Sequence, residues 1–170
     1  MPTWSHGTTR YSEGRMRYFI CPNCATRALD DDGRSGLTHQ PVGCDKCGFG
    51  YLFEILEDYY PPAGAGLVTC DRDARVLSCG KGVFELTGFA ERDVLGKPLR
   101  EAFGLSEFNG GDDPIPIVLE WGVRKLDQYM TLRHRSGIEK RVRVDLFPAY
   151  DDDGGLLASL AAASSSSTRD

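Results

Sequence analysis

The chain has 170 residues, of which 41% are hydrophobic and 26% charged, and this composition is typical of a soluble globular protein. Its net charge of −5 argues against a protein that binds nucleic acid over its whole surface, because such proteins are usually basic. No apolar run approaches the roughly 18 residues of a membrane span, and residues 1–17 lack the apolar core of a signal peptide. We therefore expect a cytoplasmic protein with one ordinary domain and a small additional module.

Two cysteine pairs dominate the first third of the chain. Residues 1–16 are polar and predict a flexible tail, and residues 17–20 predict a short strand that leads into Cys21-x-x-Cys24. Nineteen residues separate this pair from Cys44-x-x-Cys47, a spacing within the roughly 15–20 residues of structural zinc sites. Four thiolates also match the tetrahedral shell that Zn²⁺ prefers. The sequence predicts a structural zinc site with the ligands Cys21, Cys24, Cys44 and Cys47.

Two other interpretations of the cysteines remain open. Two disulfides would need an oxidising compartment, to which nothing in the sequence points. A redox C-x-x-C motif would leave the second, matching pair unexplained. Gly48 follows the second pair directly, where a small residue would let backbone N–H groups approach the sulfurs. The pattern favours zinc.

The segments around the two pairs predict a small β module. Residues 30–36 predict an exposed loop, and residues 49–56 a closing strand that could turn helical near residues 56–60. On the sequences C-P-x-C at 21–24 and C-x-x-C-G-F at 44–49, residues 17–56 resemble a zinc ribbon. About 40 residues bury little core, so we expect the metal to supply folding energy. We assign residues 17–58 to the ribbon and the Pro/Gly-rich residues 59–66 to a linker.

The remainder of the chain predicts an α+β domain over residues 67–163. It contains two strands, short helices, one longer amphipathic helix and three further strands, which together form a five-stranded antiparallel sheet with helices on one face. Residues 141–146 alternate between polar and apolar types, so we expect one buried and one wet sheet face there. The low-complexity residues 164–170 predict a disordered tail. The strands are expected at 67–70, 75–78, 126–133, 138–147 and 156–160, and the helices at 82–88, 91–95 and 115–124.

The order of these elements resembles a PAS domain of the small bacterial sensory type. The resemblance spans residues 66–163 and rests on five short stretches that occur in the family's order. PAS domains are sensory or interaction modules that often dimerise and hold a ligand between the sheet and the helices. The matching stretches are Asp71-x-Asp73-Ala-Arg75-Val76, residues 84–89 (FELTGF), residues 94–99 (VLGKPL), residues 132–137 (LRHRSG) and Pro148-x-x-Asp151-x-Asp153-Gly154.

The chain departs from the PAS pattern at three places. Gly80 stands where many PAS sequences have an asparagine that opens the first helix. The G-x-N-C-R-F-L-Q stretch of light-sensing relatives is absent, so covalent flavin is not expected. The predicted helix 115–124 has no histidine to ligate haem, and His134 falls in a strand-to-turn corner where a solvent-facing or capping histidine is expected. The small-molecule ligand of the domain stays unknown.

The resemblance implies a pocket, for which seven residues are candidates, although core packing would explain them equally well. Cys70 and Cys79 flank the first hairpin and are expected to be buried thiols, with a redox switch as the alternative. The candidates for the pocket lining are Cys79, Phe84, Leu86, Leu119, Trp121, Leu132 and Val144.

No catalytic motif appears, and a closed four-cysteine shell offers no open metal position for chemistry. We therefore expect a non-enzymatic signalling or regulatory protein that relays a signal to a partner protein, with a possible homodimer through the PAS domain. The alternative is a transcription-associated regulator that contacts nucleic acid or RNA polymerase through the ribbon. Five arginines could contact phosphates in that case: Arg10, Arg15, Arg17, Arg27 and Arg34.

Overall fold

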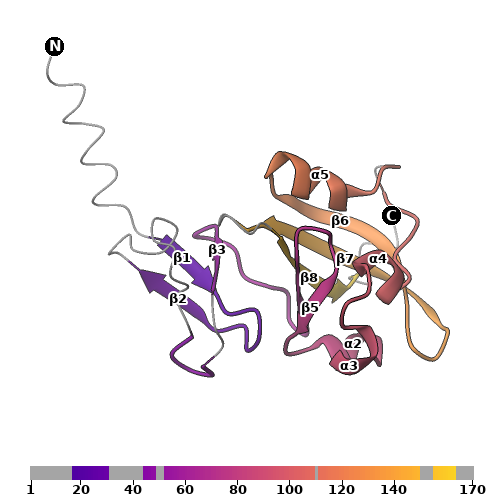
Figure 1. The fold of residues 1–170 in the computed structure, drawn as a ribbon, viewed down its shortest axis with the longest axis horizontal. Helices are drawn as coiled ribbons and strands as arrows, with labels where there is room; N and C mark the ends of the chain where they lie inside the picture. Colours follow the sequence, from indigo (N-terminus) through magenta and orange to yellow (C-terminus); the bar gives the residue numbers. More distant parts are fainter. Residues whose placement is uncertain (1–16, 31–43, 49–51, 110, 150–154, 164–170) are drawn as a thin grey trace, which may run out of the picture.

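A computed structural model describes residues 17–30, 44–48, 52–109, 111–149 and 155–163. They form two antiparallel sheets that lie side by side (Figure 1). The predicted tails at 1–16 and 164–170 lie outside the described residues, as do most of the loop predicted at 30–36 and the start of the closing strand at 49–51.

The small sheet contains three strands in the order β2-β1-β3. β1 (Arg17–Ile20) pairs with both β2 (Arg27–Asp30) and β3 (Phe53–Ile55). β1 and β3 were predicted from their apolar residues, whereas β2 was not predicted. The helical turn expected near residues 56–60 is wrong, because these residues form a turn in which the Tyr59 N–H donates to the Leu56 carbonyl at 3.1 Å.

The large sheet confirms the predicted five antiparallel strands, in the order β5-β4-β8-β7-β6. β4 and β8 are the first and last strands of this sheet along the chain, and they pair next to each other, with Val68 opposite Ala158. The bounds are Gly66–Cys70 for β4, Val76–Cys79 for β5, Lys125–Arg133 for β6, Glu139–Pro148 for β7 and Leu156–Ala162 for β8.

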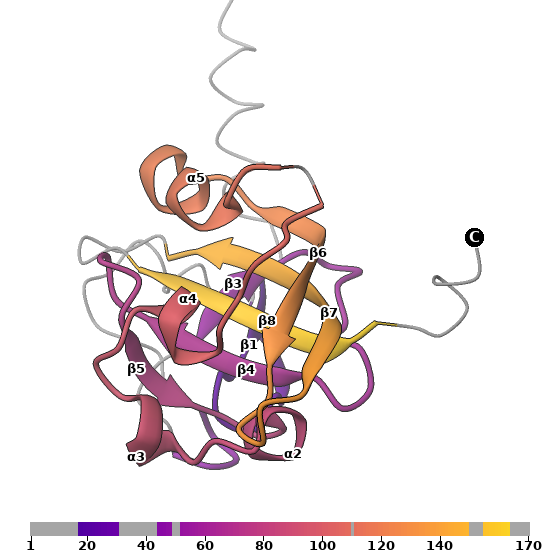
Figure 2. The same ribbon diagram turned by 90° about the vertical axis from the view of Figure 1, so that its right-hand side faces the viewer.

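Four helices connect β5 to β6 and cover one face of the large sheet: α2 (Val83–Thr87), α3 (Glu91–Val94), α4 (Leu99–Ala102) and α5 (Pro114–Trp121). Figure 2 looks onto this face, with the small sheet behind the large one. α5 begins where the Asp113 carboxylate accepts a bond from the Ile115 N–H at 3.0 Å. It ends at Gly122, whose φ of 65° is left-handed. Among the described residues, no helix is long and apolar enough to cross a bilayer.

Each face of the large sheet packs against its own apolar core. The helix-side core lies between the sheet and the helices and includes Val83, Phe103, Val118, Met130 and Leu132. The ribbon-side core joins the opposite face to the small sheet. It consists of Ile20, Phe53, Ile55, Tyr59, Leu67, Phe147 and Leu157.

The central strands alternate between the two cores. Along β8, Leu156, Ala158 and Leu160 belong to the helix-side core, whereas Leu157 belongs to the ribbon-side core. Because both faces are covered, β8 reads as a nearly continuous apolar run instead of an alternating one.

The wet face predicted for residues 141–146 is only partly correct. Arg141 is exposed, but Asp145 further along the same face of β7 is buried. Phe147, two residues on, belongs to the ribbon-side core. The outer face of β7 is therefore exposed to solvent at Arg141 and covered by the small sheet at Phe147.

Candidate metal centre

The structure brings the four predicted metal ligands together. The sulfurs of Cys21, Cys24, Cys44 and Cys47 all lie within 4.8 Å of one another. Two contacts join the pairs, at 3.6 Å between the Cys21 and Cys47 sulfurs and at 3.7 Å between those of Cys24 and Cys44. All six cysteines of the chain carry free thiols, so the geometry is not that of disulfides.

These distances fit a tetrahedral metal ion. A regular tetrahedron with metal–sulfur bonds of about 2.3 Å has edges of about 3.8 Å, close to the two sulfur–sulfur contacts. Cys21 and Cys44 are buried, Cys24 is half-buried and Cys47 is exposed. The donor set, four thiols at one point, is the one that Zn²⁺ prefers in structural sites.

The two pairs have the same backbone turn. The Ala25 N–H donates to the Cys21 carbonyl at 2.9 Å, and the Gly48 N–H donates to the Cys44 carbonyl at the same distance. Both residues have a left-handed φ, 68° for Ala25 and 81° for Gly48. Glycine at position 48 therefore suits this left-handed backbone conformation, and its own N–H donates to a carbonyl.

Burial and hydrogen bonding move the thiol pKa values in opposite directions within the first pair. Burial raises the pKa of Cys21 to about 12. Burial also opposes ionisation of Cys24, but hydrogen bonds with Thr26 and the neighbouring thiols outweigh it and lower the pKa of Cys24 to about 6. The thiols of Cys21 and Cys24 therefore do not ionise together by themselves, and a bound cation would favour the thiolate form of both.

The first cysteine turn contacts the segment between β5 and α2 through its two central residues, Pro22 and Asn23. The Asn23 carbonyl accepts a bond from the Lys81 N–H at 2.7 Å. A Cβ on Gly80 would lie 1.9 Å from the Pro22 carbonyl oxygen, so only glycine fits there. The missing PAS asparagine at this position thus has a physical reason. The first helix begins after Gly82, where no side chain caps it.

Polar contacts add to the ribbon-side core. The Tyr59 hydroxyl donates to the buried Asp145 carboxylate at 2.7 Å, and its ring meets Phe147 edge-on with the centroids 4.8 Å apart. Arg27 donates to the Glu57 carbonyl at 2.8 Å, and its guanidinium lies 4.0 Å from the centre of the Tyr60 ring. Tyr59, predicted to lie in a linker, is therefore part of the contact between the two sheets.

The predicted pocket residues divide into two groups. Leu86, Leu132 and Val144 are buried in the helix-side core, and Cys79 and Leu119 pack against it half-buried. Phe84 and Trp121 do not line the interior, because their side chains are 59% and 71% exposed. This part of the prediction is wrong, since both lie on the outer side of short helices.

Sequence reasoning missed the largest residues of the helix-side core. Phe103 is fully buried, and its ring meets that of Phe89 edge-on at 6.0 Å between centroids. Met130 on β6 is fully buried as well. Phe103 follows α4, whose four residues are too few for a periodic pattern, so no signal in the sequence identified it.

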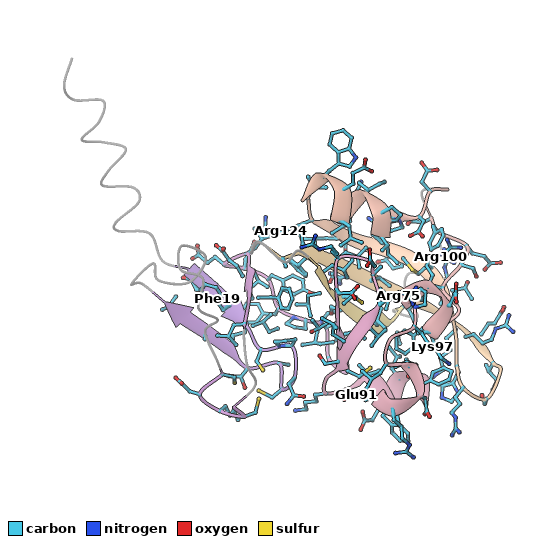
Figure 3. The ribbon with its side chains drawn as sticks, in the orientation of Figure 1. Phe19, Arg75, Glu91, Lys97, Arg100 and Arg124 are labelled. Atoms are coloured by element: carbon cyan, nitrogen blue, oxygen red, sulfur yellow. The ribbon has the colours of Figure 1, made fainter. Side chains whose placement is uncertain are left out.

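Cys70 and Cys79 are inward-facing thiols on neighbouring strands. Cys70 pairs with Val76 and Cys79 with Val68, so the two cysteines are diagonal neighbours and not directly opposite. Burial is the main cause that raises the pKa of Cys79 to about 11, and the negative charge of Glu91 adds to it. The Cys79 N–H donates to the carboxylate of Glu91, a residue labelled in Figure 3, at 2.9 Å. Both thiols are therefore protonated at neutral pH.

His134 has the capping role that was expected of it. It follows β6 in the turn, and its Nδ1 accepts a bond from the Ser136 N–H at 3.0 Å. Its ring packs against Gly88, where a Cβ would lie 2.8 Å from the His134 Cε1. These contacts hold the turn between β6 and β7 against the end of α2.

Comparison with known proteins identifies the fold of the large sheet and its helices. No protein-family model and no curated protein sequence matches the chain. Solved structures do match, and the three described next each match over 61% of this chain. A light-oxygen-voltage domain studied with a flavin analogue matches with a TM-score of 0.52, 19% identity and 81% of its own length covered.

Two further structures agree with this match. The light-state structure of the blue-light photoreceptor Aureochrome1 LOV gives a TM-score of 0.52 at 17% identity, with 85% of it covered. The PAS domain of nitrogen regulation protein NR(II) from Vibrio parahaemolyticus gives 0.50 at 12% identity, with 93% covered. The segment from β4 to β8 therefore has the PAS fold, and the four-cysteine module that precedes it is similar to a zinc ribbon.

Proposed function

We propose that this chain is a non-enzymatic, cytoplasmic signalling protein in which a PAS sensor or interaction module carries a structural zinc ribbon and relays a signal to a partner protein. The observation that carries the proposal is the ribbon-side core. It joins the metal-binding module to the outer face of a PAS sheet, so that the two act as one body. A closed shell of four sulfurs leaves no coordination position for catalysis.

Exposed apolar side chains support a protein partner. Phe84 at 59% and Trp121 at 71% exposure are large apolar side chains that a partner protein could cover. The free thiols support a reducing compartment, in which zinc-bound cysteines are stable.

Native mass spectrometry of the purified chain tests the proposal. One zinc ion per chain is expected, and the same spectrum reports any retained small molecule and the fraction of dimer. Absence of zinc from a protein purified without chelator contradicts the ribbon. An absorption spectrum with a haem or flavin band contradicts the expectation that neither is bound.

Affinity capture from a cell extract tests the relay to a partner. A protein that is retained by the wild-type chain, and that binds it again after both are purified, supports the proposal. If no protein is retained, or if none of those retained binds again as a purified component, the relay to a partner protein is wrong.

The alternative, contact with nucleic acid or RNA polymerase through the ribbon, is weakened by Arg27. Its guanidinium lies 4.0 Å from the centre of the Tyr60 ring and 5.6 Å from that of Tyr18, and it donates to a backbone carbonyl, so it is engaged within the chain. A gel shift with unrelated DNA and RNA at increasing salt decides this point. Binding that weakens steeply with salt favours nucleic acid, and no shift at low salt removes that option.

A further inference from the structure

The contact between the first cysteine turn and the PAS fold joins the metal centre to helix α2. Three groups of Asn23 take part. Its backbone N–H lies 3.3 Å from the Cys21 sulfur, its side-chain amide lies 3.5 Å from the Cys47 sulfur, and its carbonyl accepts the bond from the Lys81 N–H. One residue therefore touches two metal ligands and the backbone that leads into α2.

The start of α2 is packed so closely that it cannot shift independently of its surroundings. Added Cβ atoms would lie 1.9 Å from Pro22 at Gly80, 2.2 Å from the Ala65 carbonyl at Gly82 and 2.8 Å from Val83 at Gly66. Backbone contacts of this kind leave no flexible side chain to absorb a displacement. A movement of the cysteine turn is therefore transmitted to the backbone of α2.

The other end of α2 is bonded to the hairpin of β6 and β7. The Arg135 N–H donates to the Thr87 carbonyl at 2.8 Å, and the Lys140 ammonium donates to the Leu86 carbonyl at 3.2 Å. Helix α2 thus connects the metal centre with a hairpin on the opposite edge of the PAS sheet.

We propose that the four-cysteine site is an input to the PAS module as well as a structural element. Bound Zn²⁺ holds the first cysteine turn against Gly80 and Lys81, and release of Zn²⁺ frees the turn and loosens α2. This inference rests on the zinc site of the proposed function and adds a regulatory role to it. Metal binding and the position of α2 are then linked, so each changes the free energy of the other by the same amount.

Hydrogen exchange of the full chain, read by mass spectrometry, tests the inference. After a chelator removes zinc, we expect faster exchange at the Lys81 amide and at the α2 amides of Leu86 and Gly88, by about tenfold or more. The amide of Gly122 at the end of α5, which bonds to the Val118 carbonyl, serves as the internal control and is expected to keep its rate. Unchanged exchange in α2 overturns the inference, and so does a collapse of protection throughout the sheet, which would make the metal only a folding element.

The substitution Gly80→Ala tests the same linkage from the PAS side. It leaves all four cysteines in place but forces a Cβ against Pro22, so we expect zinc affinity to fall by about fivefold or more. Gly137→Ala is the control, because it adds strain at a left-handed φ in open space in the turn of β6 and β7. Equal zinc affinity in the two variants contradicts the inference.

Asn23→Ala covers the case in which Gly80→Ala does not fold. It removes the amide contact with Cys47, and we expect weaker zinc binding together with faster exchange at Lys81. Unaltered zinc affinity and Lys81 exchange in this variant overturn the inference.

Native mass spectrometry distinguishes failure of the zinc site from failure of the regulatory inference. A chain without zinc refutes the zinc site and the inference together, whereas a zinc-loaded chain with unresponsive α2 refutes the inference alone.

Discussion

The two faces of the PAS sheet are covered by different means. The helix-side core draws on one continuous segment between β5 and β6 together with the strands themselves, and it is almost entirely apolar. The ribbon-side core draws on a separate module and adds the Tyr59–Asp145 hydrogen bond and the four-cysteine site. A module of this size buries little apolar area by itself, so we expect metal binding and polar contacts to supply part of the stability with which it covers the sheet.

Replacing one large aromatic in each core is the strongest test of this comparison. Phe103→Ala and Phe147→Ala both remove a fully buried ring, and each is expected to cost about 3–5 kcal/mol in the free energy of unfolding, measured with urea. Only Phe147→Ala should also weaken zinc binding, because Phe147 packs against the ribbon. Equal losses of zinc affinity would mean that the two faces are not separate.

Removing the Tyr59 hydroxyl tests the polar contribution to the ribbon side. Tyr59→Phe leaves the buried Asp145 carboxylate with one donor fewer, and we expect a loss of about 1–3 kcal/mol in urea unfolding. The control is Tyr60→Phe, because Tyr60 is exposed and its ring can still stack on Arg27. If both variants lose the same stability, the buried hydrogen bond contributes nothing specific.

Raising the pH tests the buried thiols of the helix-side core, Cys70 and Cys79. The pKa of Cys79 is raised from an ordinary 9.0 to about 11, and burial raises the pKa of Cys70 as well. The unfolded chain releases these protons first, so the folded chain holds more protons in this window and its stability falls as the pH rises. We expect stability to be unaffected by these thiols below pH 9 and to decline between pH 9 and 11.

The variant Cys79→Ala should flatten this decline, measured by urea unfolding at each pH. A wild-type chain whose stability rises over the same interval would contradict the assigned protonation. The direction follows from the raised pKa, because ionising the thiol costs more free energy in the folded chain than in the unfolded chain.

Trimming Trp121 should have the smallest effect. Its side chain is 71% exposed at the end of α5, so Trp121→Ala is expected to change the free energy of unfolding by no more than about 0.5 kcal/mol. A loss comparable with that of Phe103→Ala would mean that the residue is packed in the interior, as the sequence had suggested.

Much of the architecture was predictable because its signals are local. The cysteine spacing identified all four members of the sulfur cluster, and the apolar runs identified the five strands of the large sheet. Helix α4 and strand β2 were missed; each has four residues, of which a single leucine is the only large apolar one.

The errors at Phe84 and Trp121 have a related cause. α2 has five residues and α5 has eight, so neither provides enough turns to distinguish an inward aromatic from an outward one. The reason for Gly80 was equally hidden, because the residue that excludes a side chain there, Pro22, is far away in sequence.

The double-sided burial of β4, β7 and β8 has a practical consequence for dissecting this protein. A fragment that begins after Pro62 would keep every strand of the PAS sheet. Without the small sheet, however, it would expose Leu67, Phe147 and Leu157 to water. Such a fragment is expected to aggregate or to self-associate through that surface. Studies of the PAS fold in isolation therefore require either the amino-terminal segment or polar replacements at those three positions.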